Sequence, residues 1–237
     1  VLFKNCTFSG FNAFGGAITM ATFDGCTFVA NGKSGYNGAN LWGNTKMTNT
    51  EFTFDGTASS EWVDLMGSST GTYTFNGCTV CGEPMPIETI GVYTSDNKND
   101  EVDITFNGVT YENYKTATFI STAEELFAFA NEVNVNNNTF KGKTVYLMAD
   151  IDLNNSEWTP IGNSTNQFQG TFDGNNKTIS NLVITGNNSN VGLFGMTTNG
   201  EIKNLTVNNA KVSGYLNVAV VAGTPYTSKY TNIKVTG

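Results

Sequence analysis

Pairs of carboxylates are the side chains of this 237-residue chain that could most directly catalyse a reaction. Asp55 lies close in the sequence to Glu61 and Asp64, and Asp150 lies close to Asp152. Two carboxyl groups that face a sugar from either side, one of them with a raised pKa, hydrolyse glycosidic bonds. A chain with 20 acidic residues also places some of them close together by chance. A glycoside hydrolase or polysaccharide lyase is therefore the alternative to a non-catalytic function.

The composition excludes several other kinds of chemistry. The chain has no His, and its 12 basic residues are all Lys. It therefore lacks a Ser-His or Cys-His nucleophile, a His-containing zinc site and the bidentate guanidinium clamp on carboxylates or phosphates. The net charge of -8 argues against nucleic acid or an anionic membrane as a partner. No apolar run is long enough to span a membrane, and nothing implies a cofactor.

The four cysteines fit a structural role better than a chemical one. Cys6, Cys26 and Cys78 occupy the same position of a repeated motif, which predicts that they line the interior as small apolar side chains. Cys78 and Cys81 have CxxC spacing, but a metal site needs a second pair and a redox site needs a helix after the first Cys. A disulfide, either between Cys78 and Cys81 or between coils, is the alternative.

The motif that holds these cysteines recurs along the whole chain and predicts a stack of coils. Each copy is a short strand signature that contains one residue, called the pivot here, at which the chain should turn. The pivot is Asn or Gly in all copies but one, and in that copy we assign Glu51 to the position. Asn and Gly enter the left-handed backbone region at little cost, so the chain should turn a corner there. The copies are FKNCTF (3–8), FDGCTF (23–28), NTEFTF (49–54), FNGCTV (75–80), FNGVTY (106–111), SNLVI (180–184), KNLTV (203–207) and TNIKV (231–235).

A motif that repeats along the chain and is built from short strands indicates a right-handed parallel β-helix of the all-β class. Alternation with a period of two places the residue after each pivot, and the one two positions further, inside the coil. The residue between them should face outward, which creates a column of Thr on the surface. An ice-binding face is disfavoured, because the copies differ in length and would not form a flat lattice. The predicted column consists of Thr7, Thr27, Thr53, Thr79, Thr110 and Thr206.

One segment departs from the strand repeat and divides the chain. A capping box, either Ser121 with Glu124 or Thr122 with Glu125, precedes apolar residues at helical spacing and predicts an α-helix over 122–134. We expect this helix to cover the open end of a second run of coils, which gives two regions, 1–117 and 118–237. A side decoration on one continuous stack is the alternative. Both chain ends lie within or beside a motif copy, so we expect further repeats of the same chain at both ends.

The second half resembles the GLUG-motif repeats of large bacterial surface proteins. The resemblance covers 119–237 and is carried by FQGTFDGNNKTISNL (168–182), GLFG (192–195) and GEIKNLTV (200–207), with the lead-in segments STAEEL (121–126), DIDL (150–153) and WTPIG (158–162). It implies a secreted or surface-anchored protein, usually assigned to adhesion, and supplies no catalytic residues. The stretch 218–223 departs from the pattern, because it has one Gly where the family usually has a pair.

The leading hypothesis is therefore a non-catalytic, extended surface module for cell adhesion. Its partner would be an extracellular glycan or a host surface protein. Aromatic side chains in loops could stack on sugars, whereas Trp158 belongs to the structural lead-in. Packing at the coil edges is the alternative role for each of these aromatic residues. The candidates are Tyr36, Trp42, Trp62, Tyr215, Tyr226 and Tyr230.

Overall fold

The chain forms two compact units, Val1–Lys115 and Thr116–Gly237, in the computed structural model. The boundary after Lys115 lies close to the division expected after residue 117. The structure describes residues 1–10, 15–16, 20–30, 39–41, 44–54, 63–66, 71–93 and 102–237. Parallel sheets make up both units, with a single α-helix among the described residues, so the predicted all-β parallel β-helix is confirmed, with about six turns.

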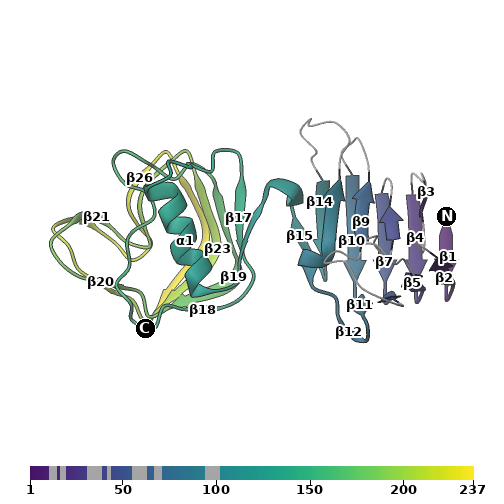
Figure 1. Cartoon of the computed structure of the whole chain (residues 1–237). Helices are drawn as coiled ribbons and strands as arrows, with labels where there is room; N and C mark the ends of the chain where they lie inside the picture. Colours follow the sequence, from purple (N-terminus) through teal and green to yellow (C-terminus); the bar gives the residue numbers. More distant parts are fainter. Residues whose placement is uncertain are drawn as a thin grey trace. The chain divides into compact units, whose positions relative to one another are not determined.

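The first unit has three sheets, one for each side of its coils (Figure 1). All neighbouring strands are parallel except at the two hairpins β11–β12 and β14–β15. Two short 3-10 helices, η1 (Ile87–Thr89) and η2 (Tyr114–Thr116), follow β12 and β15. The first sheet runs β1 (Leu2–Lys4), β4 (Met20–Asp24), β7 (Asn44–Thr48), β10 (Gly71–Asn76), β14 (Val102–Phe106) and β15 (Val109–Tyr111). The second runs β2 (Thr7–Gly10), β5 (Thr27–Ala30), β8 (Glu51–Phe54), β11 (Thr79–Val80) and β12 (Glu83–Pro84); the third runs β3 (Gly15–Gly16), β6 (Ala39–Leu41), β9 (Val63–Met66) and β13 (Ile90–Tyr93).

The second unit is built around one large parallel sheet, drawn in teal to yellow in Figure 1. Three smaller parallel pairs form the other sides of its coils. The large sheet runs β16 (Thr118–Ile120), β17 (Thr144–Leu147), β19 (Thr171–Ser180), β23 (Glu201–Asn208) and β27 (Lys229–Thr236), and β18 (Ile151–Asp152) also pairs with β19. The pairs are β20 (Val183–Ile184) with β24 (Lys211–Val212), β21 (Ser189–Val191) with β25 (Leu216–Val218), and β22 (Phe194–Thr198) with β26 (Ala222–Tyr226).

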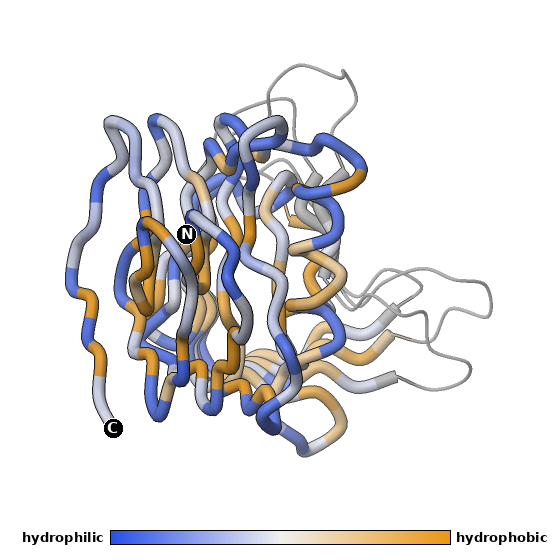
Figure 2. The backbone as a smooth tube through the Cα atoms, turned by 90° about the vertical axis from the view of Figure 1, so that its left-hand side faces the viewer, coloured by the Kyte–Doolittle hydropathy of each residue, from blue (hydrophilic) through white to orange (hydrophobic). Residues whose placement is uncertain are grey.

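Side chains alternate between the interior and the surface as the motif predicts. Cys26 and Cys78 are buried, whereas Cys6 is half-buried because it lies in the first coil. Thr7 is exposed, and Thr27 and Thr79 are partly exposed on the outer face. Inside, aromatic rings of successive coils stack: the centroids of Phe8 and Phe28 are 5.0 Å apart, and those of Phe28 and Phe52 are 5.3 Å apart. In Figure 2, hydrophobic (orange) and hydrophilic (blue) positions alternate along the strands.

The assignment of Glu51 to a corner is wrong. Asn49 has the left-handed backbone, with φ of 47°, and Glu51 is a strand residue opposite Thr27. We aligned this motif copy with the others two residues too far along the chain. A shift of two residues keeps every side chain on its expected face, so the alternation of apolar and polar residues does not reveal it. Glu51, and not Thr53, stands in the outer column, where its carboxylate accepts hydrogen bonds from the Thr79 hydroxyl and the Gly82 N–H.

The fifth motif copy turns back on itself instead of starting a new coil. Gly108 has the predicted positive φ, 84°, but Asn107 before it is left-handed too, at 48°. Two consecutive left-handed residues form the turn of a β-hairpin, so β15 runs antiparallel to β14 and Thr110 lies opposite Thr105. The placement of Thr110 in the column of stacked coils is therefore wrong. Cys81 and Gly82 make the same kind of turn between β11 and β12.

Helix α1 (Ala123–Asn134) takes the place of the remaining strands between β16 and β17. Thr122 is its N-cap and forms a capping box with Glu125, which decides between the two registers that the sequence allows. The predicted apolar face is buried against the interior of the second unit, where the Phe129 ring contacts those of Phe140, Phe168 and Phe172. The other buried residues of the helix are Leu126, Ala130 and Val133.

Candidate functional site

A groove of about 450 Å³ lies between two loops of the second unit. One wall is the segment that contains the lead-in WTPIG, and the other begins at the end of β20 and follows β21. Most of the lining side chains are small and polar, and the acidic one is Glu157. The lining residues are Asn134, Glu157, Trp158, Thr159, Pro160, Gly162, Asn163, Ser164, Ile184, Thr185, Asn188, Ser189, Asn190 and Val191.

The last residue of α1 holds the first wall in place. The Asn134 side chain donates to the Pro160 carbonyl at 2.9 Å and accepts from the Gly162 N–H at 2.8 Å. The Asn134 carbonyl accepts from the Asn166 amide at 2.8 Å. Gly162 has φ of 83°, and a Cβ there would lie 2.2 Å from the Met196 carbonyl oxygen, so no other residue fits. The helix end and this loop therefore form one rigid wall.

The opposite wall is fixed by side-chain hydrogen bonds to the next coil. Asn190 is left-handed, with φ of 61°, and its Oδ1 accepts from Asn217 Nδ2 at 2.7 Å and from Thr224 Oγ1 at 2.6 Å. Trp158 lies beneath the groove: its ring is buried, and its Nε1–H donates to the Leu193 carbonyl at 3.0 Å. The groove is thus preformed, with an apolar floor and polar walls.

Glu157 is unsuited to act with a second carboxylate. Its two oxygens accept from the backbone N–H and the hydroxyl of Thr185, at 2.7 and 3.0 Å. It is the single acidic residue among those that line the groove in the described part of the chain. Hydrolysis of a glycosidic bond requires a pair of such groups. The groove can therefore bind a ligand with its amides, hydroxyls and one carboxylate, but it does not present the usual catalytic pair.

The predicted pair Asp150 and Asp152 supports the backbone of neighbouring coils. Asp150 accepts from the Thr178 N–H at 2.7 Å. Asp152 accepts from Asn181 Nδ2 at 2.7 Å and from the Asn154 N–H at 2.8 Å, and these bonds hold the pKa of its carboxyl below the ordinary value of 3.8. A general acid needs the opposite shift. Asp55, Glu61 and the Asp64 side chain lie outside the residues that the structure describes.

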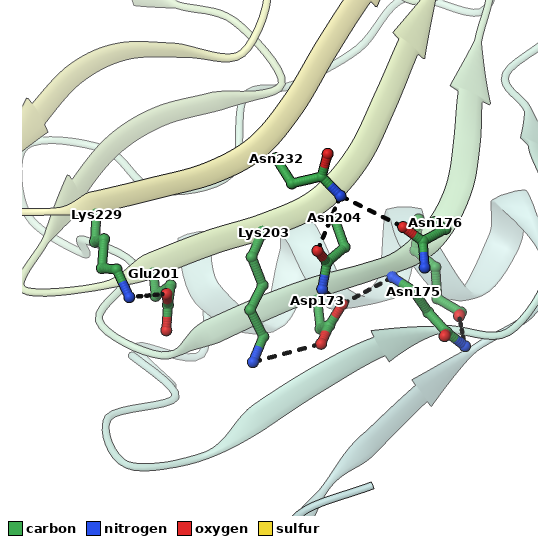
Figure 3. A network of polar contacts seen from close by, with 9 residues as sticks. Asp173, Asn175, Asn176, Glu201, Lys203, Asn204, Lys229 and Asn232 are labelled. Carbon is green, nitrogen blue, oxygen red and sulfur yellow. Dashed lines mark hydrogen bonds and ion pairs between the residues drawn. The ribbon is translucent and has the colours of Figure 1, made fainter. Parts of the chain in front are cut away.

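Asparagine side chains stack from coil to coil at the corners of this unit. Asn232 Nδ2 donates to Asn204 Oδ1 at 3.1 Å, and Asn204 Nδ2 donates to Asp173 Oδ1 at 3.0 Å (Figure 3). Beside this ladder, Lys203 pairs with Asp173 at 3.5 Å. A second ladder runs from Asn209 to Asn181 and on to Asp152. The sequence predicted the corners but not these ladders, in which the amides of one corner bind those of the next.

The predicted aromatic candidates divide into three groups. Tyr36, Trp42 and Trp62 lie outside the described residues. Tyr215 and Tyr226 are exposed, at 73% and 54% of their surfaces.

Tyr230 is half-buried, with its hydroxyl 3.0 Å from that of Thr197; burial raises the pKa of this phenol, and the hydrogen bond with Thr197 opposes the shift. It therefore packs against the core and does not offer a free face.

Tyr215 is the predicted candidate that lies beside the groove. Its N–H donates to the carbonyl of Asn188, a wall residue, at 2.8 Å. Tyr226 is in β26 opposite Thr198, on another side of the coil. The sequence reasoning missed the polar groove residues, because Asn134 and Asn190 are far apart in the chain and Asn is abundant everywhere. The one available signal was their position beside predicted turns.

In the part of the chain that the structure describes, the cysteines and acidic residues show no further site. All four cysteines are free, and burial raises the pKa of the Cys78 thiol to about 11, which makes it unreactive. Within the described ranges, no group of three or more Cys, Asp or Glu side chains is arranged to hold a metal ion. In the same part of the chain, no helix has the length and apolar character needed to cross a membrane.

Comparison with known proteins identifies one similarity. Halomucin from Haloquadratum walsbyi is 38% identical over an alignment of 119 residues, and this alignment covers 44% of this chain and 1% of that protein. The chain thus spans only a small part of the length of that protein. No family model and no solved structure matches the chain.

Proposed function

We propose that this chain is a non-catalytic module of a secreted or cell-surface protein and that the groove of its second unit binds glycans. The observation that carries the proposal is the groove itself: a preformed hollow with an apolar floor, polar walls and an exposed tyrosine beside it. Sites for small ligands are typically concave, with an apolar lining and a few fixed polar groups.

The chemistry of the walls suits an uncharged, hydroxylated ligand. Side-chain amides and hydroxyls such as those of Asn188, Ser189 and Ser164 both donate and accept hydrogen bonds, as sugar hydroxyls do. A single carboxylate, Glu157, adds an acceptor. An aromatic ring beside such a groove offers an apolar face on which a sugar ring can stack, and Tyr215 is placed for this. A strongly anionic ligand fits poorly, because the lining residues include no cation.

The surface location rests on two further observations. The similarity to halomucin supports a mucin-like or other cell-surface setting, although the match covers 1% of that protein. The resemblance of 119–237 to GLUG-motif repeats supports the same setting and adds bacterial origin and adhesion. A rigid stack of coils is also suited to holding a binding site away from a cell.

A glycan array of neutral oligosaccharides, followed by titration of the best binder, tests the proposal. We expect Asn188→Ala and Tyr215→Ala to weaken binding at least about fivefold, or roughly 1 kcal/mol. Asn187→Ala and Tyr226→Ala are matched controls, because these residues are exposed but lie outside the groove. Binding that all four variants retain equally would refute the groove as the site. Release of oligosaccharides from any bound glycan would refute the non-catalytic function.

A further inference from the structure

The acceptor sequence for N-linked glycosylation, Asn-x-Ser or Asn-x-Thr with x other than Pro, occurs seven times in this chain. A chain rich in Asn and Thr contains such triplets by chance, so the sequence alone does not show which Asn can carry a glycan. A glycan is bulky and hydrophilic. In the folded chain it therefore needs an Asn whose Nδ2 faces solvent and forms no hydrogen bond within the fold. The seven residues are Asn5, Asn137, Asn154, Asn163, Asn176, Asn187 and Asn204.

Three of the seven are left-handed corner residues whose amides contact the adjacent coil. Asn204 Oδ1 accepts from Asn232 Nδ2 at 3.1 Å, and the same Nδ2 lies 3.5 Å from Asn176 Oδ1 (Figure 3). Asn5 lies against Gly25 of the next coil, where a Cβ would come within 2.6 Å of Asn5 Oδ1. A glycan on any of these three amides would disturb the contact between coils.

Two more of the seven use their Nδ2 atoms, to which a sugar would be attached, within turns of the second unit. Asn163 Nδ2 donates to the Asn134 carbonyl at 3.4 Å, and Asn163 Oδ1 accepts from the Thr165 N–H at 2.9 Å. Asn154 Nδ2 donates to the Asp152 carbonyl at 3.4 Å. A glycan on either amide would compete with a hydrogen bond that closes the turn.

Asn137 and Asn187 remain, and the two sites differ at the hydroxyl that the acceptor sequence requires. Both Asn residues are exposed, and within the part of the chain that the structure describes neither side chain forms a hydrogen bond or an ion pair. Thr139, two residues after Asn137, is half-buried, and its carbonyl accepts from the Gln169 N–H at 2.8 Å. Ser189, two residues after Asn187, is exposed. Asn187 therefore combines a free amide with an accessible hydroxyl.

Asn187 lies in the loop between β20 and β21, and the whole loop is exposed. A Cβ on the neighbouring Gly186 would meet no atom within 4 Å, so there is open space beside the Asn187 backbone. A coil flanks this loop on each side, because Val183 pairs with Glu157 of the preceding coil and with Lys211 of the following one. The exposure of Asn187 is thus a property of the loop itself.

We propose that Asn187 is an N-glycosylation site, with a polyprenyl diphosphate-linked oligosaccharide as the donor. In the transfer, Asn187 Nδ2 forms a bond to the anomeric carbon of the sugar, and the bond from that carbon to the diphosphate oxygen breaks. The lipid diphosphate leaves with the electron pair, and one amide proton passes to a base of the transferase. The proposal rests on the secreted or cell-surface location proposed above, because N-linked glycans occur on surface loops of secreted chains.

Peptide mapping tests the site on the whole chain, secreted from a host whose transferase recognises Asn-x-Ser and Asn-x-Thr. Peptide N-glycosidase in heavy-oxygen water converts each glycosylated Asn to a labelled Asp, which mass spectrometry locates. We expect the label at Asn187 and none at Asn204 in the folded, secreted protein. An unlabelled Asn187, or a label at Asn137 in its place, would overturn the proposal.

Substitutions at the hydroxyl position separate glycosylation from other changes at Asn187. Ser189→Ala should abolish the label at Asn187, whereas Ser189→Thr should retain it, because either hydroxyl completes the acceptor sequence. Thr206→Ala is the matched control, because it removes the acceptor sequence of Asn204 and should leave the glycan content unchanged. Circular dichroism and thermal melting establish that each variant is folded. A Ser189→Ala chain that keeps the label, or a Thr206→Ala chain that loses a glycan, would overturn the proposal.

The same peptide, taken from the cells that make this protein, distinguishes the site from the proposed function. Asn187 without a glycan, in protein found at the cell surface, would overturn the site and leave the proposed groove binding intact. Groove binding is measured on chain made in a host without the transferase, so a failure to bind glycans there would refute the groove and not the modification. Protein confined to the cytoplasm would overturn the proposed location and the site together.

Discussion

The corner residues show how a single backbone conformation selects the amino acid. Among the described residues, all non-glycine residues with positive φ are Asn except Cys81, Phe140 and Thr227. Asn tolerates the left-handed region because its short side chain bonds locally. At several corners of the second unit its amide also binds the Asn of the adjacent coil, as Asn209 binds Asn181 and Asn232 binds Asn204. The same position therefore serves both local geometry and the contact between coils.

Gly77 tests the cost of this conformation. Its φ is 59°, and a Cβ there would lie 2.7 Å from Asn49 Oδ1. We expect Gly77→Val to lower the free energy of unfolding by about 1–3 kcal/mol more than Gly77→Asn, because both add a Cβ but only Val is strained at positive φ. Urea denaturation measures the difference. Equal stabilities for the two variants would show that the left-handed corner is not what excludes Val.

Asp152 should contribute to stability in a pH-dependent way. Hydrogen bonds from Asn181 and Asn154 lower its pKa below the ordinary 3.8, so the native state favours the ionised form. Its contribution is therefore present above the unfolded-state pKa and is lost as the pH falls through the lower, native-state value. Asp152→Asn should make melting temperature less dependent on pH below about 4 and leave that dependence unchanged near pH 7. If Asp152→Asn leaves the pH dependence of the melting temperature in acid unchanged, the proposed linkage is contradicted.

At the scale of elements, α1 shows how one helix can replace several strands. Its capping box fixes the start, and its buried face continues the aromatic stacking of the coils through Phe129. The interior of the second unit therefore meets a helix instead of another set of strands beside β16 and β17. That the helix serves as an end cover for this stack stays a prediction.

Phe129→Asp tests the role of the helix. The change places a charge without a partner among Phe140, Phe168 and Phe172, so we expect a loss of about 3–5 kcal/mol and aggregation through uncovered strands. Ala128→Asp is the matched control, because position 128 is exposed on the same helix. Thermal melting and light scattering report both effects. A monomeric Phe129→Asp variant with the same melting temperature as Ala128→Asp would show that the helix is not needed to cover the stack.

At the scale of the whole molecule, the second unit has a hydrophobic core of its own. The core that contains the helix runs from Ile120 to Val207 and includes only residues of the second unit. A unit with its own core can fold independently. The division of the chain into two domains follows as a proposal.

A fragment of residues 116–237 tests this division. We expect it to keep the circular dichroism of its strands and helix and to unfold cooperatively, because its core and its capping box lie within the fragment. The near-ultraviolet signal of Trp158, which is buried against Leu193, reports native packing. An unfolded fragment, or one that recovers structure only when residues 1–115 are added, would show that the two units fold as one.

The sequence by itself determined the period-two pattern, the corner residues and the helix. Each of these depends on neighbours in the chain: alternation places Cys26 and Phe28 inside, positive φ selects Asn181 and Gly77, and a capping box starts α1. For the same reason the sequence left a two-residue slip at Glu51 undetected and did not separate the hairpin at Gly108 from a coil corner. Both depend on which strand pairs with which.

Only the tertiary structure decided where the groove lies, which side chains form the ladders and which groups the carboxylates bind. Asn134 reaches Pro160, and Asn232 reaches Asn204, across separations of 26 and 28 residues. Nothing local distinguishes these Asn residues from the others. Stacking brings one coil against the next, so the bonding partner of a polar side chain depends on the number of residues in the coil that separates the two positions. That number follows from packing across the whole stack.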